Sequence, residues 1–328
     1  MYILGIFVIE KLDLKDKKIL IELDTDATQP FSRIAKKLRL SQEVVAYRVR
    51  QLEKRGVILS YNTLSHFAKT GMVHYKLYIK FGKISREEKK SVIDYLLKFR
   101  NVGWLATSEG IFDLMLAIRF RDVFSFENFK DLFFGLYDKH FHEVKFAILT
   151  EAETKPRYYI LPQQLVKPTI FLHCDEAAVE PLDEDDRRIL SAIAANARDS
   201  YKSLAEKTGL SERVIRYRRK EMEKKGVIVS YKLVINYRKL NYLFFKCFLT
   251  FRNLTRQRYS LFRGYVRMHP NIIYWIKILG AWDAELEIEV PSIEEFYEIA
   301  NDIKDKFSDV IETFEASLVS HEHAWVQA

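Results

Sequence analysis

The sequence contains a long internal repeat, and this feature limits its fold more than any other. When the chain is aligned with itself at a shift of 170 residues, positions 12–61 match positions 182–231 at 20 of 50 places without a gap. The same register continues further along, where Gly-Ile-Phe-Asp at 110–113 aligns with Gly-Ala-Trp-Asp at 280–283. The chain is therefore two copies of one unit joined in tandem, and a site in one copy has a counterpart to be sought in the other.

The first part of each copy, residues 13–61 and 183–231, has the pattern of three helices followed by a strand. An aspartate at an N-cap position precedes the first helix, and apolar residues then recur at helical spacing. After a tight turn, Ser41 or Ser211 occupies the N-cap position of a longer basic helix that ends at a glycine, and a short apolar strand follows. This order of elements predicts a winged helix-turn-helix.

The second part of each copy has a different periodicity. Polar and apolar residues alternate over residues 74–81, which predicts a strand with one buried face. Helices are predicted over residues 85–99 and 125–137, and further strands over residues 102–108, 112–119 and 144–150. The order βαββαβ, which the second copy repeats from residue 242 to residue 318, is that of a ferredoxin-like αβ sandwich.

The predicted fold class is therefore α+β, with two winged helix-turn-helix domains alternating with two ferredoxin-like (βαββαβ) domains. The expected boundaries are 1–68 for the first helix-turn-helix domain with an N-terminal arm, 69–151 for the first αβ domain, 152–181 for a linker, 182–238 for the second helix-turn-helix domain and 239–328 for the second αβ domain. Four prolines mark the linker, because proline breaks regular structure.

Composition limits the class of protein and its location. Apolar residues make up 48% of the chain, which is typical of a globular protein, and a net charge of +8 favours an anionic partner. Two isolated cysteines and the lack of an apolar run of membrane length predict a cytoplasmic protein without a membrane partner. The pairs His140/His142 and His321/His323 lie apart from the cysteines, so we expect neither a metal nor another cofactor.

Both predicted third helices are basic. The first has four basic and two acidic residues (net +2), and the second has seven and three (net +4). On an exposed recognition helix, such side chains neutralise phosphates, and Arg or Gln near its N-terminus reaches base edges in the major groove. We therefore expect double-stranded DNA as the partner. The candidate DNA-binding residues are Ser41, Gln42, Tyr47, Arg48, Arg50, Lys54, Ser211, Arg213, Arg216, Tyr217, Arg218 and Lys220.

Arg219 departs from this pattern. It takes the place of Val49, which the helical spacing directs inward. A charged side chain there must reach the surface or find a partner. Either the second recognition helix is rotated, or its module has drifted from strict DNA reading. A basic helix also has a plainer explanation, as the solvated face of a helix that packs on other protein.

The motifs of both parts resemble the Lrp/AsnC (feast/famine) family of prokaryotic transcription regulators. The resemblance rests on the Leu-Ser turn, on Glu-Lys-x-Gly-Val-Ile at 53–58 and 223–228, and on the Gly-x-aromatic-Asp loop, and it covers residues 12–151 and 182–321. It implies a sequence-specific DNA-binding regulator in which the two halves pair inside one chain; a further homo-oligomer is left open. It also implies an effector site, often for an amino acid, where αβ domains meet. The residues that it points to are Gly110, Asp113, Thr150, Gly280, Asp283 and Ser320.

Three alternatives stay open. The glycine and aspartate of each loop satisfy turn geometry without any ligand. The sirohaem decarboxylases share this architecture, but they carry a histidine-rich signature on the second strand of the αβ domain. Residues 101–105 and 271–275 contain no histidine, so we expect no enzyme. The third alternative is an effector sensor that no longer binds DNA, for which Arg219 is the support.

Overall fold

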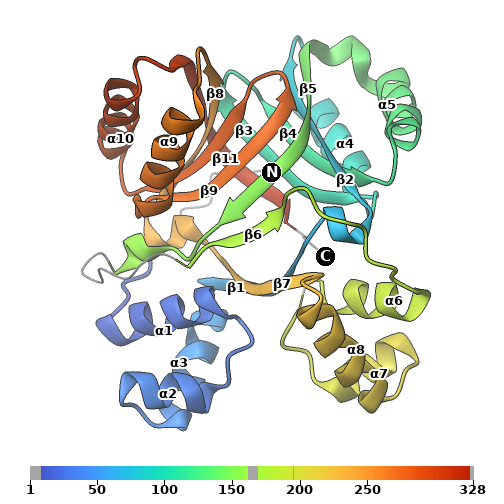
Figure 1. Ribbon diagram of the computed structural model, residues 1–328, viewed down its shortest axis with the longest axis vertical. Coiled ribbons are helices and arrows are strands. Elements are labelled where there is room, and N and C mark those ends of the chain that lie inside the picture. The colour runs from blue at the N-terminus through green and yellow to red at the C-terminus, as the bar shows by residue number, and fades with distance from the viewer. Residues whose placement is uncertain (1–8, 162–168, 195, 326–328) are drawn as a thin grey trace.

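The computed structural model describes residues 9–161, 169–194 and 196–325, and it forms two lobes (Figure 1). The lower lobe in this view holds two groups of three helices joined by a two-stranded sheet. The upper lobe holds a curved sheet with helices on its outer sides. The element order confirms the α+β class and the alternation of helix-turn-helix and αβ domains, which are called module 1, αβ domain 1, module 2 and αβ domain 2 in chain order.

Each module contains the three helices and the strand that its sequence predicts. Module 1 holds α1 (Leu14–Thr25), α2 (Phe31–Leu38), α3 (Gln42–Lys54) and β1 (Ile58–Ser65), and module 2 holds α6 (Glu184–Ile193), α7 (Tyr201–Thr208), α8 (Glu212–Lys224) and β7 (Ile228–Ile235). Asp13 and Asp183 cap α1 and α6 by accepting a hydrogen bond from the backbone N–H three residues later. The apolar faces of the helices share one buried cluster that runs through both modules.

The strands β1 and β7 join the two modules. They form an antiparallel two-stranded sheet in which Tyr61 lies opposite Leu233. Each strand also contacts the end of the first helix of the other module. The Thr63 N–H donates to the Ala194 carbonyl (3.1 Å), and the Ala27 N–H donates to the Tyr231 carbonyl (2.8 Å). The modules are therefore interlocked by hydrogen-bonded backbone.

The αβ domains repeat the expected order βαββαβ. Domain 1 holds β2 (Val73–Phe81), α4 (Arg86–Leu96), β3 (Val102–Gly110), β4 (Leu114–Phe120), α5 (Val123–Tyr137) and β5 (Phe141–Thr154), and domain 2 holds β8 (Leu243–Phe251), α9 (Arg256–Met268), β9 (Ile272–Gly280), β10 (Ala284–Val290), α10 (Ile293–Lys306) and β11 (Ile311–Trp325). Short 3₁₀ helices join them at η1 (Ala68–Thr70), η2 (Asp138–His140), η3 (Tyr158–Ile160) and η4 (Tyr237–Leu240). None of the described helices combines the length and the apolar character needed to cross a bilayer.

The strands of both αβ domains form one closed sheet. The order is β2-β4-β3-β11-β8-β10-β9-β5, and β5 pairs with β2 again, so that the sheet closes on itself. The last strand of each domain makes the closure, because its second half crosses to the other copy: β11 pairs with β3, and β5 pairs with β9. The helices cover the outside, with α4 and α5 on one side and α9 and α10 on the other (Figure 1).

Closure of the sheet changes the surroundings of β2. The alternation over residues 74–81 predicts one buried face, and both faces are buried. Tyr75, Leu77 and Ile79 pack in the cluster under α4 and α5, as expected. His74, Lys76 and Tyr78, expected on a solvated face, are buried. Lys76 and Tyr78 bind Glu285 of the second copy, and His74 stacks on Phe67.

The segment expected to be a linker is partly regular and partly buried. The strand expected over 144–150 extends from Phe141 to Thr154, because its second half must reach the other copy. A short strand β6 (Phe171–Cys174) then pairs with β5. Arg157 and Tyr159 lie between them in the chain, and both bind Glu289 of αβ domain 2. The first part of the segment therefore belongs to the core, although it contains proline.

Candidate nucleic-acid interface

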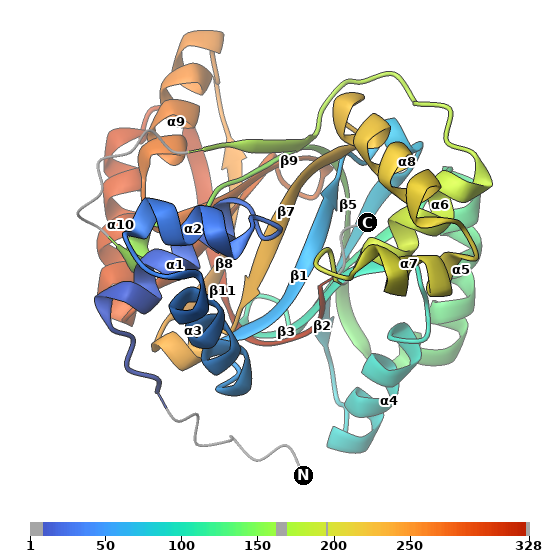
Figure 2. The ribbon, with the colours of Figure 1, turned by 90° about the horizontal axis from the view of Figure 1, so that it is seen from below.

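The third helices of the two modules occupy equivalent positions. Seen from below, α3 and α8 lie on opposite sides of the β1–β7 ribbon (Figure 2). Each follows a tight turn with a left-handed residue, Arg39 (φ 55°) or Gly209 (φ 71°). Ser41 and Ser211 then cap the helices, and each hydroxyl accepts a hydrogen bond from the backbone N–H three residues later (3.3 Å in both). The two serines thus set where the third helices begin.

Ten of the twelve candidate DNA-binding residues are exposed: Ser41, Gln42, Tyr47, Arg50, Lys54, Ser211, Arg213, Arg216, Tyr217 and Lys220. Tyr47 and Tyr217 are equivalent residues and are 60% and 65% exposed, although their rings are large. The guanidinium of Arg216 lies over the Tyr201 ring, 4.1 Å from its centre, which holds its side chain beside α7. Each third helix therefore presents hydrogen-bonding, cationic and aromatic groups to the outside.

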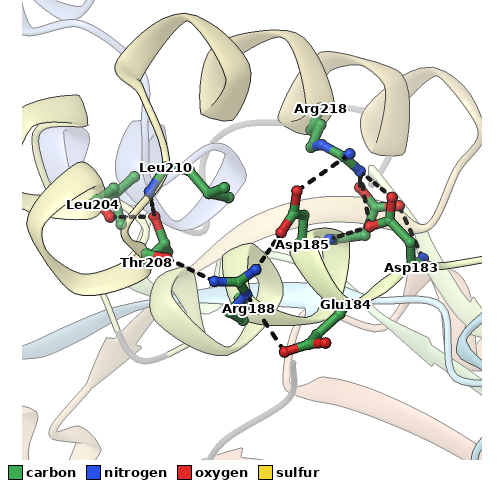
Figure 3. Close-up of polar contacts among 9 residues, drawn as sticks. Asp183, Glu184, Asp185, Arg188, Leu204, Thr208, Leu210 and Arg218 are labelled. Atoms are coloured by element: carbon green, nitrogen blue, oxygen red, sulfur yellow. Dashed lines mark hydrogen bonds and ion pairs between the residues drawn. The ribbon is translucent and has the colours of Figure 1, made fainter.

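Arg48 and Arg218, the other two candidates, are bound inside their modules. Arg48 contacts Asp13 (2.8 Å) and Asp16 (2.7 Å) at the start of α1. Arg218 contacts the equivalent Asp183 (2.7 Å) and Asp185 (Figure 3). It also contacts Asp186 (3.0 Å). These pairs fasten each third helix to the start of the first.

These ion pairs also affect the aspartates. The pKa of Asp183 is below its ordinary value, because its carboxylate accepts the Asp186 N–H and a bond from Arg218. Asp183 and Arg218 are 35 residues apart in the chain, so that their pairing cannot be read from local spacing. Only the repetition of both partners in the two copies, as Asp13 and Arg48, signals it in the sequence.

Module 2 has further contacts that fix its turn. Arg188 in α6 binds Asp185 and donates to the Thr208 carbonyl (3.2 Å) at the end of α7 (Figure 3). The Thr208 hydroxyl donates to the Leu204 carbonyl (2.7 Å) and accepts the Leu210 N–H (3.4 Å). These bonds hold the turn before α8 to the first helix.

Arg219 has partners, and its helix is not rotated. The inward face of α8 consists of Ile215, Arg219 and Met222, the same positions that face inward in α3. The Arg219 Nε–H donates to the Tyr231 hydroxyl (2.7 Å), and Glu223 lies 3.4 Å away. The guanidinium also lies over the Tyr231 ring. The expectation of a rotated helix is thus wrong, because Tyr231 and Glu223 satisfy the buried charge.

Arg198 connects the modules, and the sequence gives no sign of it. It belongs to module 2, but its guanidinium lies over the rings of Phe31 (4.3 Å) and Tyr61 (5.3 Å) in module 1. It also donates to the Ala27 carbonyl (2.7 Å). Its counterpart in the repeat is Thr28, so the contact exists on one side of the molecule only.

Four of the six residues that the resemblance assigns to an effector site, Gly110, Thr150, Gly280 and Ser320, lie where the strands of the two αβ domains pair. Asp113 and Asp283 bind backbone of their own domain. A Cβ at Gly110 would be 2.9 Å from the Ala316 carbonyl oxygen, and one at Gly280 would be 2.6 Å from that of Phe146. Both glycines also have positive φ (133° and 137°), so that the crossing strand and the backbone conformation both require glycine. Ser320 lies on the same crossing strand as Ala316, and its hydroxyl bonds to that of Thr107 (3.1 Å).

The polar groups of these six residues already have partners. The Thr150 hydroxyl donates to the Lys277 carbonyl (3.2 Å). The carboxylates of Asp113 and Asp283 accept the backbone N–H of Phe81 (2.8 Å) and Phe251 (2.7 Å). The described residues contain no group of three or more His, Cys, Asp or Glu side chains placed to hold a metal ion.

Comparison with known proteins gives two kinds of match. Residues 12–53 match the family model of the AsnC-type helix-turn-helix domain, and residues 182–229 match that of a winged helix-turn-helix DNA-binding domain. The chain is 38% identical over 112 residues to the HTH-type transcriptional regulator LrpA of Pyrococcus horikoshii, covering 34% of this chain and 77% of that protein. It is 32% identical over 119 residues to the transcriptional regulator AzlB of Bacillus subtilis, covering 36% of this chain and 76% of that one.

A solved structure matches nearly the whole chain. The siroheme decarboxylase NirDL superposes with a TM-score of 0.61 over 95% of this chain and 93% of its own, at 13% sequence identity. Identity this low shows a shared fold and nothing about activity. The identity to regulators over most of their length is much higher, and helix-turn-helix matches fall in both copies. The chain therefore belongs to the Lrp/AsnC family of DNA-binding transcription regulators, with the family's unit present twice.

Proposed function

We propose that this protein is a sequence-specific transcription regulator whose two modules contact one DNA duplex as a covalent pseudo-dimer. One observation carries the proposal: equivalent exposed surfaces of α3 and α8 are held on either side of the interlocked β1–β7 sheet. Since the modules share hydrogen-bonded backbone, the separation of their recognition helices is fixed. A fixed separation favours an imperfect palindrome with half-sites one helical turn, about 10 base pairs, or a multiple of it apart.

The exposed candidate residues of α3 and α8 with charged or amide side chains divide into candidates for base contact and candidates for phosphate contact. Gln42 and Arg50 of module 1, and Arg213 and Arg216 of module 2, are our candidates for base contact, because they lie away from the packed face. The two other exposed cations among the candidate DNA-binding residues, Lys54 and Lys220, are candidates for phosphate contact. Arg48 and Arg218 contribute to DNA binding indirectly, because their ion pairs hold the third helices in position.

The charges inside the closed sheet support pairing of the two unlike halves. Lys76 and Lys246 are equivalent residues, and both bind Glu285 at the centre. On the inward face of β10 the second copy has Glu285, Glu287 and Glu289, where the first copy has Met115, Ala117 and Arg119 on β4.

Two first halves would thus bury lysine and arginine without these glutamates, and two second halves would crowd six glutamates together. Because an uncompensated buried charge is costly, each half fits the other copy better than itself.

Two cavities inside the closed sheet are too small for the alternative enzyme's substrate. In the described part of the chain they measure about 50 Å³, beside Lys76 and Trp104, and about 30 Å³, beside Glu289 and Glu322. Sites for organic ligands of drug size usually occupy about 300–1,000 Å³. A related structure of NirDL contains an iron-uroporphyrin III analogue, and this compound gives a direct test. We expect no change in its absorbance spectrum on mixing with the protein.

An amino-acid-like effector at the αβ junctions is the second part of the proposal. It rests on family membership and on the meeting of Gly110 with the strand that carries Ser320. Each polar group there is bonded within the protein, so that an effector must displace these bonds. A thermal-shift screen of the common amino acids, with a Ser320→Ala variant as control, tests this part separately.

The test of DNA binding uses the fragment upstream of the protein's own gene, with bulk DNA as competitor. Because several phosphates are contacted, affinity should fall by a factor of about 10³ or more between 50 and 200 mM salt. Fluorescence anisotropy measures this directly. No binding to either DNA at low salt would contradict the proposal.

A further inference from the structure

A large cationic cleft lies between αβ domain 1 and module 2. Its volume is about 550 Å³, within the range of small-molecule sites. Four arginines line it: Arg100, Arg119 and Arg121 from αβ domain 1, and Arg187 from α6. Asp122 is the one acidic residue among its lining residues, and its carboxylate already caps α5 by accepting bonds from Ser125. The described walls of the cleft thus carry an excess of positive charge.

Arg119 lines the cleft, is largely buried and has no counter-ion among the described residues. It lies in β4, opposite His74 of β2, and is 8% exposed. No hydrogen bond or ion pair joins its guanidinium to any residue in the described part of the chain. Burial lowers the pKa of Arg119 to about 10, and burial together with this charge lowers the pKa of His74. No Arg119 nitrogen is among the fully buried side-chain atoms that lack a partner, so the guanidinium reaches the space of the cleft that it lines. A guanidinium that faces a cleft without a protein acceptor is available to an anionic ligand.

The residue equivalent to Arg119 in the second copy has charged and polar partners. The counterpart of Arg119 is Glu289, and the chain itself fills the space beside it. The Arg157 Nε–H donates to the Glu289 carboxylate (2.9 Å), and the Tyr159 hydroxyl binds the same carboxylate. The Tyr159 ring packs on Tyr242, 4.3 Å between centres.

Here the segment between the copies supplies a charge opposite to that of the buried residue. No described residue supplies such a charge to Arg119. The two copies therefore differ: one junction of module and αβ domain is closed by an internal ion pair, and the other is open and cationic.

We propose that the open cleft binds a small molecule carrying two or more negative charges on phosphate or carboxylate groups. Arg119 binds one anionic group at the base, since a guanidinium fork matches both oxyanions in a bidentate geometry. Arg100, Arg121 and Arg187 bind a second group nearer the opening, where their side chains are exposed. The anionic ligand would bind Arg119 as Arg157 and Tyr159 bind Glu289 in the other half, with the signs of the charges reversed.

The position of the cleft favours a small molecule over DNA as its ligand. Arg187 and Ser191 belong to α6, which lies on the side of module 2 next to αβ domain 1, with α7 on the far side (Figure 1). The exposed residues proposed to contact DNA lie on α3 and α8, and none of them lines the cleft. A bound anion would hold α6 to β4, so it would act directly on the first helix of module 2. This effect on DNA binding rests on the function proposed above; binding of the anion does not.

The test measures binding of two probes to the full-length protein without DNA. Pyrophosphate represents phosphate ligands and citrate represents carboxylate ligands, each titrated calorimetrically at constant ionic strength. The variant is Arg119→Met, and the control is Arg86→Met, which removes the same charge from an exposed position at the start of α4. We expect at least one probe to bind the wild type, a loss of tenfold or more with Arg119→Met, and a change of less than twofold with Arg86→Met. The tighter probe assigns the anionic group.

A second measurement guards against a variant that merely misfolds. Without ligand, Arg119→Met should melt at or above the wild-type temperature, because the substitution removes an uncompensated buried charge. The probe that binds should raise the melting temperature of the wild type and not that of the variant.

The proposal is overturned if neither probe binds, or if Arg119→Met binds as well as the wild type. A protein that binds a probe and no DNA would contradict the regulator proposal alone.

Discussion

Three arginines of α8, Arg216, Arg218 and Arg219, have different surroundings and hence different expected roles. Arg216 is exposed beside Tyr201, Arg218 is tied to the aspartates that begin α6, and Arg219 is buried on Tyr231. All three belong to one basic helix, and their charges are identical in the sequence. Their surroundings therefore separate DNA contact from helix placement and core packing.

Substitution of Arg216 and Arg218 should separate base recognition from helix placement. Arg216→Ala should cost about 1–3 kcal/mol of discrimination between the operator and a copy with a changed base at its half-site. Arg218→Ala should weaken binding to both duplexes alike, since it frees α8 from α6, and should also lower the melting temperature. Anisotropy with the two duplexes measures both effects. An equal loss on both duplexes for Arg216→Ala would reassign this residue to phosphate contact.

Glu322 should make stability depend on pH. It lies in β11 and accepts a hydrogen bond from the Trp104 Nε1–H (2.8 Å). Burial, with the nearby carboxylates of Glu287 and Glu289, raises the pKa of Glu322 to about 7. The folded pKa exceeds the unfolded one, so the contribution of Glu322 to stability is full below about pH 4.5 and is lost as pH rises to 7.

Glu322→Gln should therefore match the wild type near pH 4.5 and exceed its unfolding free energy by about 2 kcal/mol at pH 8. Urea denaturation at the two pH values measures the difference. Glu315→Gln, on the exposed part of the same strand, is the control and should show no such trend. A Glu322→Gln variant that differs from the wild type by the same amount at both pH values would contradict this account.

At the scale of elements, the sequence predicts what each copy does alone, and it fails where the copies meet. The helices and strands of each unit follow from caps and periodicity, as at Asp13 and Ser41. The inward face of β2 looked solvated because lysine and tyrosine alternate with apolar residues there, and the second copy that buries them lies about 200 residues away.

The candidate site divides in the same way. The exposed positions of α3 and α8 follow from helical spacing, whereas the ion pairs of Arg48 and Arg218 depend on contacts between helices. No local pattern distinguishes Arg119, because its distinguishing feature is that no described residue pairs with its guanidinium.

Removal of Arg198 should loosen the connection between the modules. Arg198→Ala loses the contacts with Phe31 and Tyr61 and the bond to the Ala27 carbonyl, and we expect about 1–2 kcal/mol of destabilisation. Amide hydrogen exchange should become faster in β1 and β7, and operators with altered half-site spacing should be bound relatively better. Lys202→Ala, on the exposed face of α7, serves as control. Unchanged exchange in both strands would show that the β1–β7 sheet is sufficient by itself.

At the scale of the whole molecule, the two halves should recognise each other and not themselves. When residues 1–156 and 157–328 are co-expressed with different tags, we expect a mixed pair with one of each half, because Glu285 lies between Lys76 and Lys246. Size-exclusion chromatography and pull-down of each tag measure this. Two monomeric halves without mutual affinity would refute the covalent pseudo-dimer.

The difference between the modules has a consequence for gene orientation. A dimer of identical chains looks the same from both ends of its operator, so it cannot tell upstream from downstream. Here α3 and α8 differ in sequence, and the arginine-lined cleft includes a helix of module 2, α6, and no helix of module 1 among the described residues. A duplex with unlike half-sites would seat this chain in one direction, with the cleft always toward the same gene. A homodimer needs a neighbouring protein to define its direction on the operator, whereas this single polypeptide would define the direction by itself.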